Sequence, residues 1–96
     1  MNEIENALAP NIGEDYAKLN ITYAGEQGDL PAPIPFDIDD DEVRRIAAEA
    51  IRAGTVPGID ADPTASLDGF IVKPYGARDG LPNRIVIRPA TPYGKR

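Results

Sequence analysis

One amphipathic helix constrains this chain more than any other feature. Its apolar positions form a single stripe with spacings of 3, 4, 7 and 8 residues: Val43, Ile46, Ala47, Ala50 and Ile51. The acidic run at 39–42 suits a helix start, because carboxylates cap free N–H groups and meet the positive end of the helix dipole. Gly54 suits the C′ position, and Pro57 prevents continuation. One stripe must be buried against one apolar surface, which the rest of the chain has to supply.

Two strands are predicted before this helix. Residues 18–24 alternate between apolar and polar, as in a half-buried strand. Residues 25–29 contain two glycines and are predicted to be a loop. Residues 34–38 alternate again and should complete an N-terminal hairpin with the first strand. Proline cannot donate to a strand ladder, so the prolines at 31, 33 and 35 predict that this second strand lies at a sheet edge.

Two more strands are predicted after the helix. The first covers residues 70–72, and residues 73–75 can extend it. The last covers residues 84–88, where basic and β-branched residues alternate. A long connection at 55–67 and a turn at 76–82 precede these strands.

The order strand, strand, helix, strand, strand predicts an α+β fold, with the helix packed across one face of a four-stranded mixed sheet. One common solution places the last strand beside the first and parallel to it. We expect a flexible N-terminal arm (1–17), one domain (18–88) and an extended C-terminal tail (89–96), because Pro89 and Pro92 remove backbone donors. The predicted core is Leu19, Ile21, Tyr23, Ile34, Phe36, Ile38, Val43, Ile46, Ala47, Ala50, Ile51, Phe70, Val72, Ile85 and Ile87.

Composition narrows the classes of function. The chain has 96 residues, no Cys and no His, which removes disulfides, thiol nucleophiles, imidazole bases and the usual zinc ligands. We therefore expect neither an enzyme nor a cofactor. A net charge of −6 disfavours nucleic acid and favours a protein partner with a basic surface. No stretch has the roughly 20 apolar residues of a membrane span, and the lack of Cys favours a cytoplasmic protein without membrane partners.

This order of elements resembles the β-grasp fold of ubiquitin-like proteins, and the likeness covers about residues 18–94. The acidic helix start Asp39-Asp40-Asp41-Glu42-Val43, the segment Val56-Pro57-Gly58-Ile59 after the helix and the last strand at 84–88 are similar to that family. The resemblance implies a bacterial-type protein modifier or protein-binding module. The sequence departs from the family by ending Tyr93-Gly94-Lys95-Arg96 instead of Gly-Gly, so conjugation would need removal of Lys95 and Arg96 to leave Gly94.

The candidate partner-binding residues lie on the outward face of the last two strands and in the tail: Ile71, Lys73, Tyr75, Arg84, Val86, Arg88, Tyr93 and Gly94. The alternative is that these residues have no binding role and form an ordinary solvated strand surface and a frayed chain end. One helix cannot cover both faces of a sheet, however. We therefore expect the exposed apolar pair Ile71 and Val86 to be covered, either by a partner or by the N-terminal arm.

Other acidic clusters carry less weight. The run at 37–42 lacks the glycine and glutamate spacing of a calcium loop and is better explained as a helix cap. Asp60, Asp62 and Asp68 share a long connection, where a role in turns is the simpler explanation.

Three functional hypotheses remain open. The first is a ubiquitin-like modifier or binding module that is recognised by its sheet face and tail. The second is a structural or assembly protein, such as a phage or secretion component, whose arm and tail clasp neighbours. The third is an acidic inhibitor or immunity protein that covers a basic site.

Overall fold

The computed structural model of the chain describes residues 13–90, and its helix agrees closely with the prediction. Helix α2 spans Asp40–Ala53. The Asp39 carboxylate caps it by accepting a hydrogen bond of 2.9 Å from the Glu42 N–H. Gly54 ends the helix at φ +72°, a left-handed conformation that suits glycine. The local signals at both ends therefore suffice to set the helix bounds.

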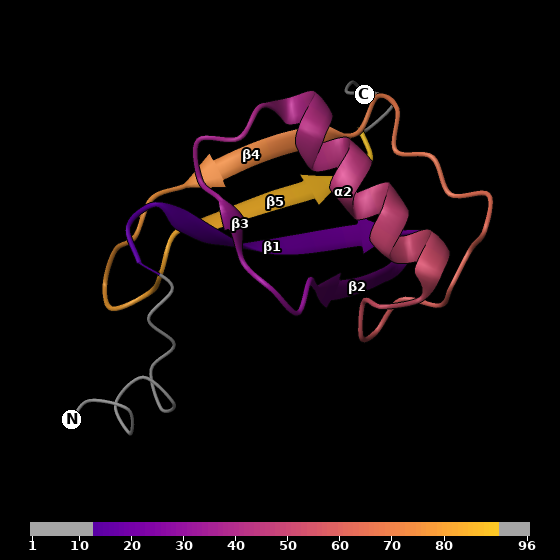
Figure 1. The fold of residues 1–96 in the computed structure, drawn as a ribbon, viewed down its shortest axis with the longest axis horizontal. Helices are drawn as coiled ribbons and strands as arrows, with labels where there is room; N and C mark the ends of the chain where they lie inside the picture. Colours follow the sequence, from indigo (N-terminus) through magenta and orange to yellow (C-terminus); the bar gives the residue numbers. More distant parts are fainter. Residues whose placement is uncertain (1–12, 91–96) are drawn as a thin grey trace, which may run out of the picture.

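The strands form a mixed sheet in which the first and last strands are central neighbours (Figure 1). They are β1 (Tyr16–Tyr23), β2 (Glu26–Asp29), β4 (Ile71–Tyr75) and β5 (Arg84–Arg88), in the order β2-β1-β5-β4. The pairing of β1 with β5 is parallel, which is the common solution considered for this order of elements, and places Lys18 opposite Arg84. The pairings of β1 with β2 and of β4 with β5 are antiparallel. The described residues thus form an α+β fold with one helix and five strands.

The predicted N-terminal hairpin is wrong in its second strand. Strand β2 occupies the predicted loop at 25–29, because Ala24 (φ +53°) and Gly25 (φ +81°) make a two-residue turn that places Glu26 opposite Tyr23. The predicted strand at 34–38 shrinks to β3 (Ile34–Pro35), which pairs with the start of β1. The neighbouring prolines lack the donors that a longer ladder needs. A non-glycine residue at positive φ gives no clear signal in the sequence.

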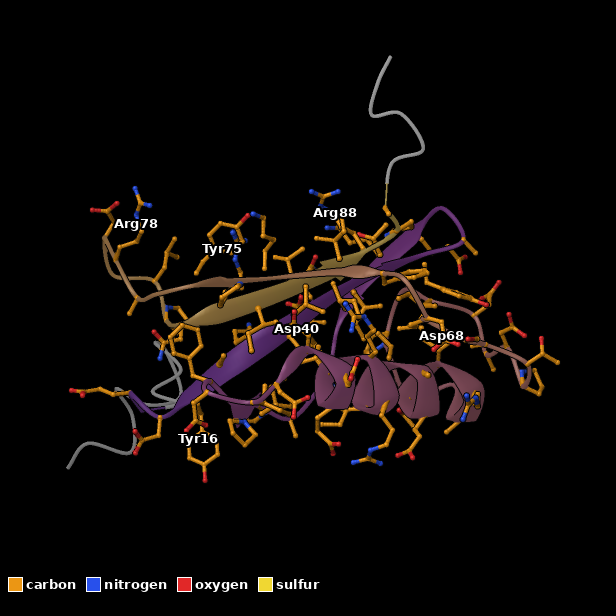
Figure 2. The ribbon with its side chains drawn as sticks, turned by 90° about the horizontal axis from the view of Figure 1, so that it is seen from above. Tyr16, Asp40, Asp68, Tyr75, Arg78 and Arg88 are labelled. Atoms are coloured by element: carbon orange, nitrogen blue, oxygen red, sulfur yellow. The ribbon has the colours of Figure 1, made fainter. Side chains whose placement is uncertain are left out.

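Helix α2 lies across one face of the sheet, and the core fills the space between these two layers (Figures 1 and 2). Alternate residues of β1 and β5 point toward the helix and are fully or almost fully buried: Leu19, Ile21, Ile85 and Ile87. The facing helix residues Val43, Ala47 and Ile51 are equally buried. Six predicted core residues only pack at its margin: Tyr23, Phe36, Ile38, Ile46, Phe70 and Val72.

The long connection between α2 and β4 is part of the core, which the sequence did not predict. It buries Val56, Ile59, Ala65 and Leu67 without helical or strand periodicity. Its first part lies directly against β2. A Cβ atom added to Gly28 would lie 2.0 Å from the Pro57 carbonyl oxygen, so the close approach requires glycine there.

Two boundaries differ from the prediction. Strand β1 begins at Tyr16, and Ala17 is fully buried, so these two residues belong to the sheet and not to the N-terminal arm. Strand β4 begins at Ile71, one residue later than expected. The rest of the predicted arm at 1–12 and the tail residues 91–96 lie outside the described residues. Within 13–90, no helix has the length and apolar character needed to cross a bilayer.

Candidate protein-interaction face

The sheet has a second face, opposite α2, and six predicted site residues lie on it together. Cross-strand pairing of β4 with β5 places Ile71 opposite Arg88, Lys73 opposite Val86 and Tyr75 opposite Arg84. Because side chains alternate along a strand, these residues share the face that the buried Ile85 and Ile87 do not use. Tyr75 and Arg88 project from the sheet on the side away from the helix (Figure 2).

Lys18 joins this group, although it was not among the predicted site residues. It alternates with the buried Leu19 and pairs with Arg84 across the parallel β1–β5 ladder. Alternation alone could have indicated that Lys18 points outward, but its neighbour depends on a pairing between residues far apart in the sequence. We define the basic face as Lys18, Ile71, Lys73, Tyr75, Arg84, Val86 and Arg88.

The charges of the basic face are mostly unopposed. Lys18 pairs loosely with Asp29 on β2, at 3.8 Å from nitrogen to oxygen. Within residues 13–90, the three other cations form no ion pair: Lys73, Arg84 and Arg88. The Arg84 guanidinium instead lies over the Tyr75 ring, 5.2 Å from its centroid, a contact that contributes about 0.5–1 kcal/mol when exposed. A cluster of like charges remains on the surface of an acidic chain.

Apolar atoms lie among these cations. Ile71 and Val86 are half-buried, yet neither belongs to the hydrophobic residues that pack against the core. Each lies opposite a long basic side chain whose aliphatic stem can cover it partially. Tyr75 is 43% exposed and adds an aromatic ring. Basic, aliphatic and aromatic groups side by side are typical of surfaces that bind proteins.

The β2 side of the same face is polar and internally paired. Asn20 donates to the Asp29 carboxylate at 2.8 Å and accepts from the Gln27 amide at 3.0 Å. These side chains form hydrogen bonds with one another. The cations of β4 and β5 form no ion pair within residues 13–90. The end of the face that carries unsatisfied charge is therefore the β4–β5 end.

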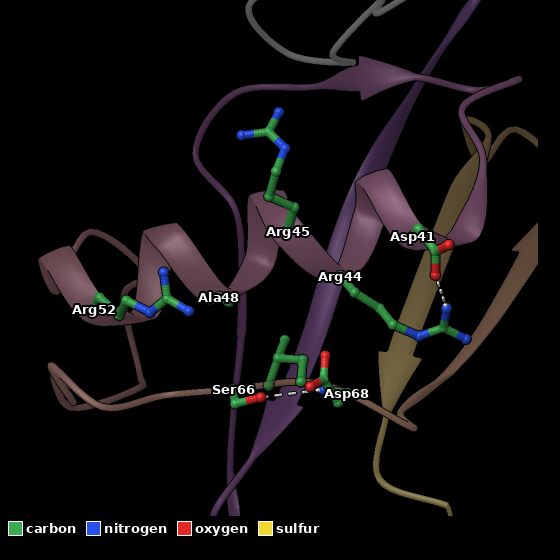
Figure 3. Close-up of a pocket in the computed structure, with 8 residues that line it drawn as sticks. Asp41, Arg44, Arg45, Ala48, Arg52, Ser66 and Asp68 are labelled. Atoms are coloured by element: carbon green, nitrogen blue, oxygen red, sulfur yellow. Dashed lines mark hydrogen bonds and ion pairs between the residues drawn. The ribbon is translucent and has the colours of Figure 1, made fainter.

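A second surface feature is a groove of about 280 Å³ between α2 and residues 66–68 (Figure 3). Two arginines of α2 form hydrogen bonds to the backbone on the opposite side of the groove. The Arg44 Nε donates to the Phe70 carbonyl and the Arg52 Nε to the Ala65 carbonyl, both at 2.9 Å. Arg44 also pairs with Asp41 at 2.7 Å. These bonds bind the long connection to the helix, so we assign the two arginines a structural role.

Arg45 points away from this groove and is occupied elsewhere (Figure 3). Its guanidinium pairs with Glu42 and with Glu49, the latter at 2.9 Å. The hydrogen bond from Arg45 lowers the pKa of the Glu42 carboxyl below its usual value. Arg45 is therefore a cation with its own partners, unlike Lys73, Arg84 and Arg88, which form no ion pair within residues 13–90.

The acids of the long connection do not come together as a site. The Asp62 carboxylate accepts a hydrogen bond of 2.5 Å from the Tyr23 hydroxyl, which lowers the pKa of Asp62 and raises that of Tyr23. The Asp60 N–H donates to the Glu26 carboxylate at 2.8 Å. In the described part of the chain, no group of three or more acids is arranged to hold a metal ion. The cap explanation for Asp39 in the acidic run is confirmed.

Two predicted site residues, Tyr93 and Gly94, lie outside the described residues. The last described residues, Pro89 and Ala90, are exposed and follow β5 directly. Comparison of the chain with models of protein families, with curated proteins and with solved structures finds no match.

Proposed function

We propose that this chain is a ubiquitin-like protein of the β-grasp type that binds another protein through its basic face. The strand order β2-β1-β5-β4, with parallel central strands and a helix across one face, supports the β-grasp assignment. The basic face is left uncovered by that helix in the described residues. No catalytic group is invoked, and the proposed activity is recognition.

A single observation carries the proposal: three cations that form no ion pair within residues 13–90 and two half-buried aliphatic side chains share one sheet face of a chain with net charge −6. The stability of the fold does not explain this clustering of positive charge, because like charges on neighbouring strands repel each other. A partner that brings carboxylates and an apolar anchor would relieve the repulsion and cover Ile71 and Val86. Nucleic acid fits less well, since the rest of the molecule would repel its phosphates.

Site-specific crosslinking in the native host tests this proposal. A photoreactive amino acid at position 73 reports on the basic face, and the same residue at the exposed position 49 on α2 is the matched control. We expect one discrete protein adduct from position 73 that is absent from position 49. The additional change Arg88→Glu should abolish it by reversing a neighbouring charge. Adducts of equal pattern from both positions would refute the assignment of the face.

The tail supplies the second part of the proposal, that of a covalent modifier. Pro89 and Ala90 are exposed, which supports an exit of the chain from the sheet at the Ile71–Arg88 end of the basic face. Removal of Lys95 and Arg96 would leave Gly94 as a terminal glycine, which a narrow enzyme channel can admit because it lacks Cβ. The intact mass of protein from its host should then show this loss or a branched adduct through Gly94. An unprocessed mass in every fraction would reject conjugation and leave non-covalent binding as the function.

A further inference from the structure

We propose that residues 1–12 of this chain dock on its own basic face and compete there with the partner. This regulatory role rests on the proposed function, because the competition has a purpose only if the face binds a partner. The docking itself is a property of the isolated chain and can be measured without any partner.

Charge complementarity is the first argument. Residues 1–12 carry Glu3 and Glu5 as their only charged side chains, and Glu14 and Asp15 follow them directly. The basic face carries Lys18, Lys73, Arg84 and Arg88 and contains no acid. Of these cations, only Lys18 has an ion-pair partner within residues 13–90. The C-terminal residues 91–96 would be repelled instead, because Lys95 and Arg96 are their only charged side chains.

The place where this segment joins the sheet is the second argument. The buried Asn83 amide donates to the Glu14 carbonyl at 2.8 Å and to the Tyr16 carbonyl at 3.1 Å. Asn83 immediately precedes Arg84, so the start of β1 is tied to the Tyr75–Arg84 end of the basic face. Residues 1–12 are therefore attached beside the surface that they are proposed to cover.

The available length is sufficient. An extended chain spans at most about 3.3–3.6 Å per residue, so residues 1–12 can reach roughly 40 Å. The five residues of β5 span only about 17 Å at strand geometry. At the same rise, Glu5 and Ile4 lie within roughly 26–32 Å of Gly13, which covers the length of the face, and Leu8 lies within about 17 Å, which covers the Tyr75–Arg84 end.

The apolar residues also match. Ile4, Leu8 and Ile12 recur every four residues, and Glu3 and Glu5 flank the first of them. The face offers Ile71, Val86 and the exposed Tyr75 ring between its cations. Individual exposed ion pairs contribute little. Tethering raises the effective concentration into the millimolar range, so weak contacts suffice for docking within one chain.

Paramagnetic relaxation in the full-length protein tests the docking. Because the chain has no Cys, Asn6→Cys creates a single site for a nitroxide label. We expect amide signals of Lys73, Val86 and Arg88 to lose at least half of their intensity, while the signal of Glu49 on α2 is unchanged. Adding Glu3→Lys and Glu5→Lys to the labelled chain should restore the amide signals of the basic face, and so should high salt.

Three results would overturn the proposal. The amide signals of the basic face could keep their intensity, or the signals of α2 could lose as much intensity as those of the basic face. In a mixture of labelled and unlabelled molecules, the unlabelled molecules could lose intensity. The last would identify a second copy as the occupant. Crosslinking from position 73 should increase several-fold when residues 1–12 are deleted, and an unchanged yield would contradict competition. Failure of the proposed function is distinguishable, because relaxation would then report docking while position 73 gives no partner adduct.

Discussion

Asn83 shows how one residue can connect distant parts of this chain. It is the only buried polar residue among residues 13–90. Its Oδ1 accepts from the Ala77 N–H at 2.8 Å, and its Nδ2 donates to two carbonyls before and within β1. A buried polar side chain is costly unless it is hydrogen-bonded, and the Asn83 amide is bonded to three backbone groups at once.

Replacing Asn83 with Ala should therefore destabilise the protein well beyond a surface change. The Ala77 N–H and the Glu14 and Tyr16 carbonyls would lose their partner, at a cost of about 1–3 kcal/mol in the free energy of unfolding. Urea unfolding followed by circular dichroism measures this difference. Gln27→Ala, at an exposed position, is the control and should change stability by less than about 0.5 kcal/mol. Equal stability of the two variants would contradict the role of Asn83.

Tyr23 and Asp62 form a second residue-scale link, and it depends on pH. The Tyr23 hydroxyl must be protonated to donate, and the Asp62 carboxylate binds it best when ionised. The folded-state pKa of Asp62 is lowered, so its contribution is present above the unfolded pKa of about 3.9 and is lost as pH falls through the folded pKa. The raised pKa of Tyr23 means that its contribution is lost only as pH rises above about 10.

Tyr23→Phe should consequently destabilise the protein at neutral pH and much less in acid. The urea midpoint of the variant should lie below that of the parent near pH 7. The gap should begin to narrow as the pH falls below about 4, the unfolded pKa of Asp62, and should close as the pH falls through the lowered folded-state pKa of Asp62. Tyr16→Phe, at an exposed tyrosine, should show no such pH dependence. A difference in urea midpoint that stays constant as the pH is lowered would rule out the ionised Asp62 as the partner of Tyr23.

At the scale of elements, β2 is shaped by the connection that follows α2. Gly28 approaches the Pro57 carbonyl, and Gly58 approaches the Gln27 carbonyl, at distances that leave no room for a Cβ atom. A short strand without apolar residues would have little reason to stay at a sheet edge. Backbone contact with the connection provides that reason, because it covers the inner side of β2.

Gly28→Ala should separate these two elements. The added methyl group would meet the Pro57 carbonyl at 2.0 Å, so one backbone must shift, at a cost of roughly 1–3 kcal/mol. The loss should appear in urea unfolding and as faster amide exchange at residues 26–29. Gly76→Ala is the matched control, because nothing lies within 4 Å of its added Cβ and its φ is not positive. Protection of β2 that survives Gly28→Ala would disprove the close approach.

Across the whole molecule, helix, sheet and connection share one core. Leu67, from the connection, is as deeply buried as Ile85 of β5. The connection also receives hydrogen bonds from Arg44 and Arg52 of α2. The basic face and the core thus lie on opposite sides of the same sheet, and the core holds the strands in the register that assembles the face.

Leu67→Ala should therefore destabilise the whole domain and not only a loop. Removing a fully buried leucine costs about 2–5 kcal/mol. Because the core is shared, unfolding followed by tyrosine fluorescence and by far-ultraviolet circular dichroism should remain coincident. Ser66→Ala, at the exposed neighbouring position, should leave the midpoint nearly unchanged. Two separate transitions in Leu67→Ala would show that the connection folds independently of the sheet.

Local patterns were enough for several parts of this protein. The Asp39 cap and Gly54 determine the helix bounds, since their effects act within one turn. The strand β5 was predicted with its observed bounds, because alternation is a property of adjacent residues. Alternation also identified the outward positions of β4 and β5, and therefore six residues of the basic face.

Other features were decided only by contacts between residues far apart in the chain. The parallel pairing that brings Lys18 beside Arg84, the burial of Leu67 in an aperiodic connection and the hydrogen bonds of Asn83 depend on tertiary packing. The sequence by itself determined which residues face outward, because that depends on the pleat of one strand. Only the tertiary structure decided which of them are neighbours, because register and close approach are set by the partners across the sheet.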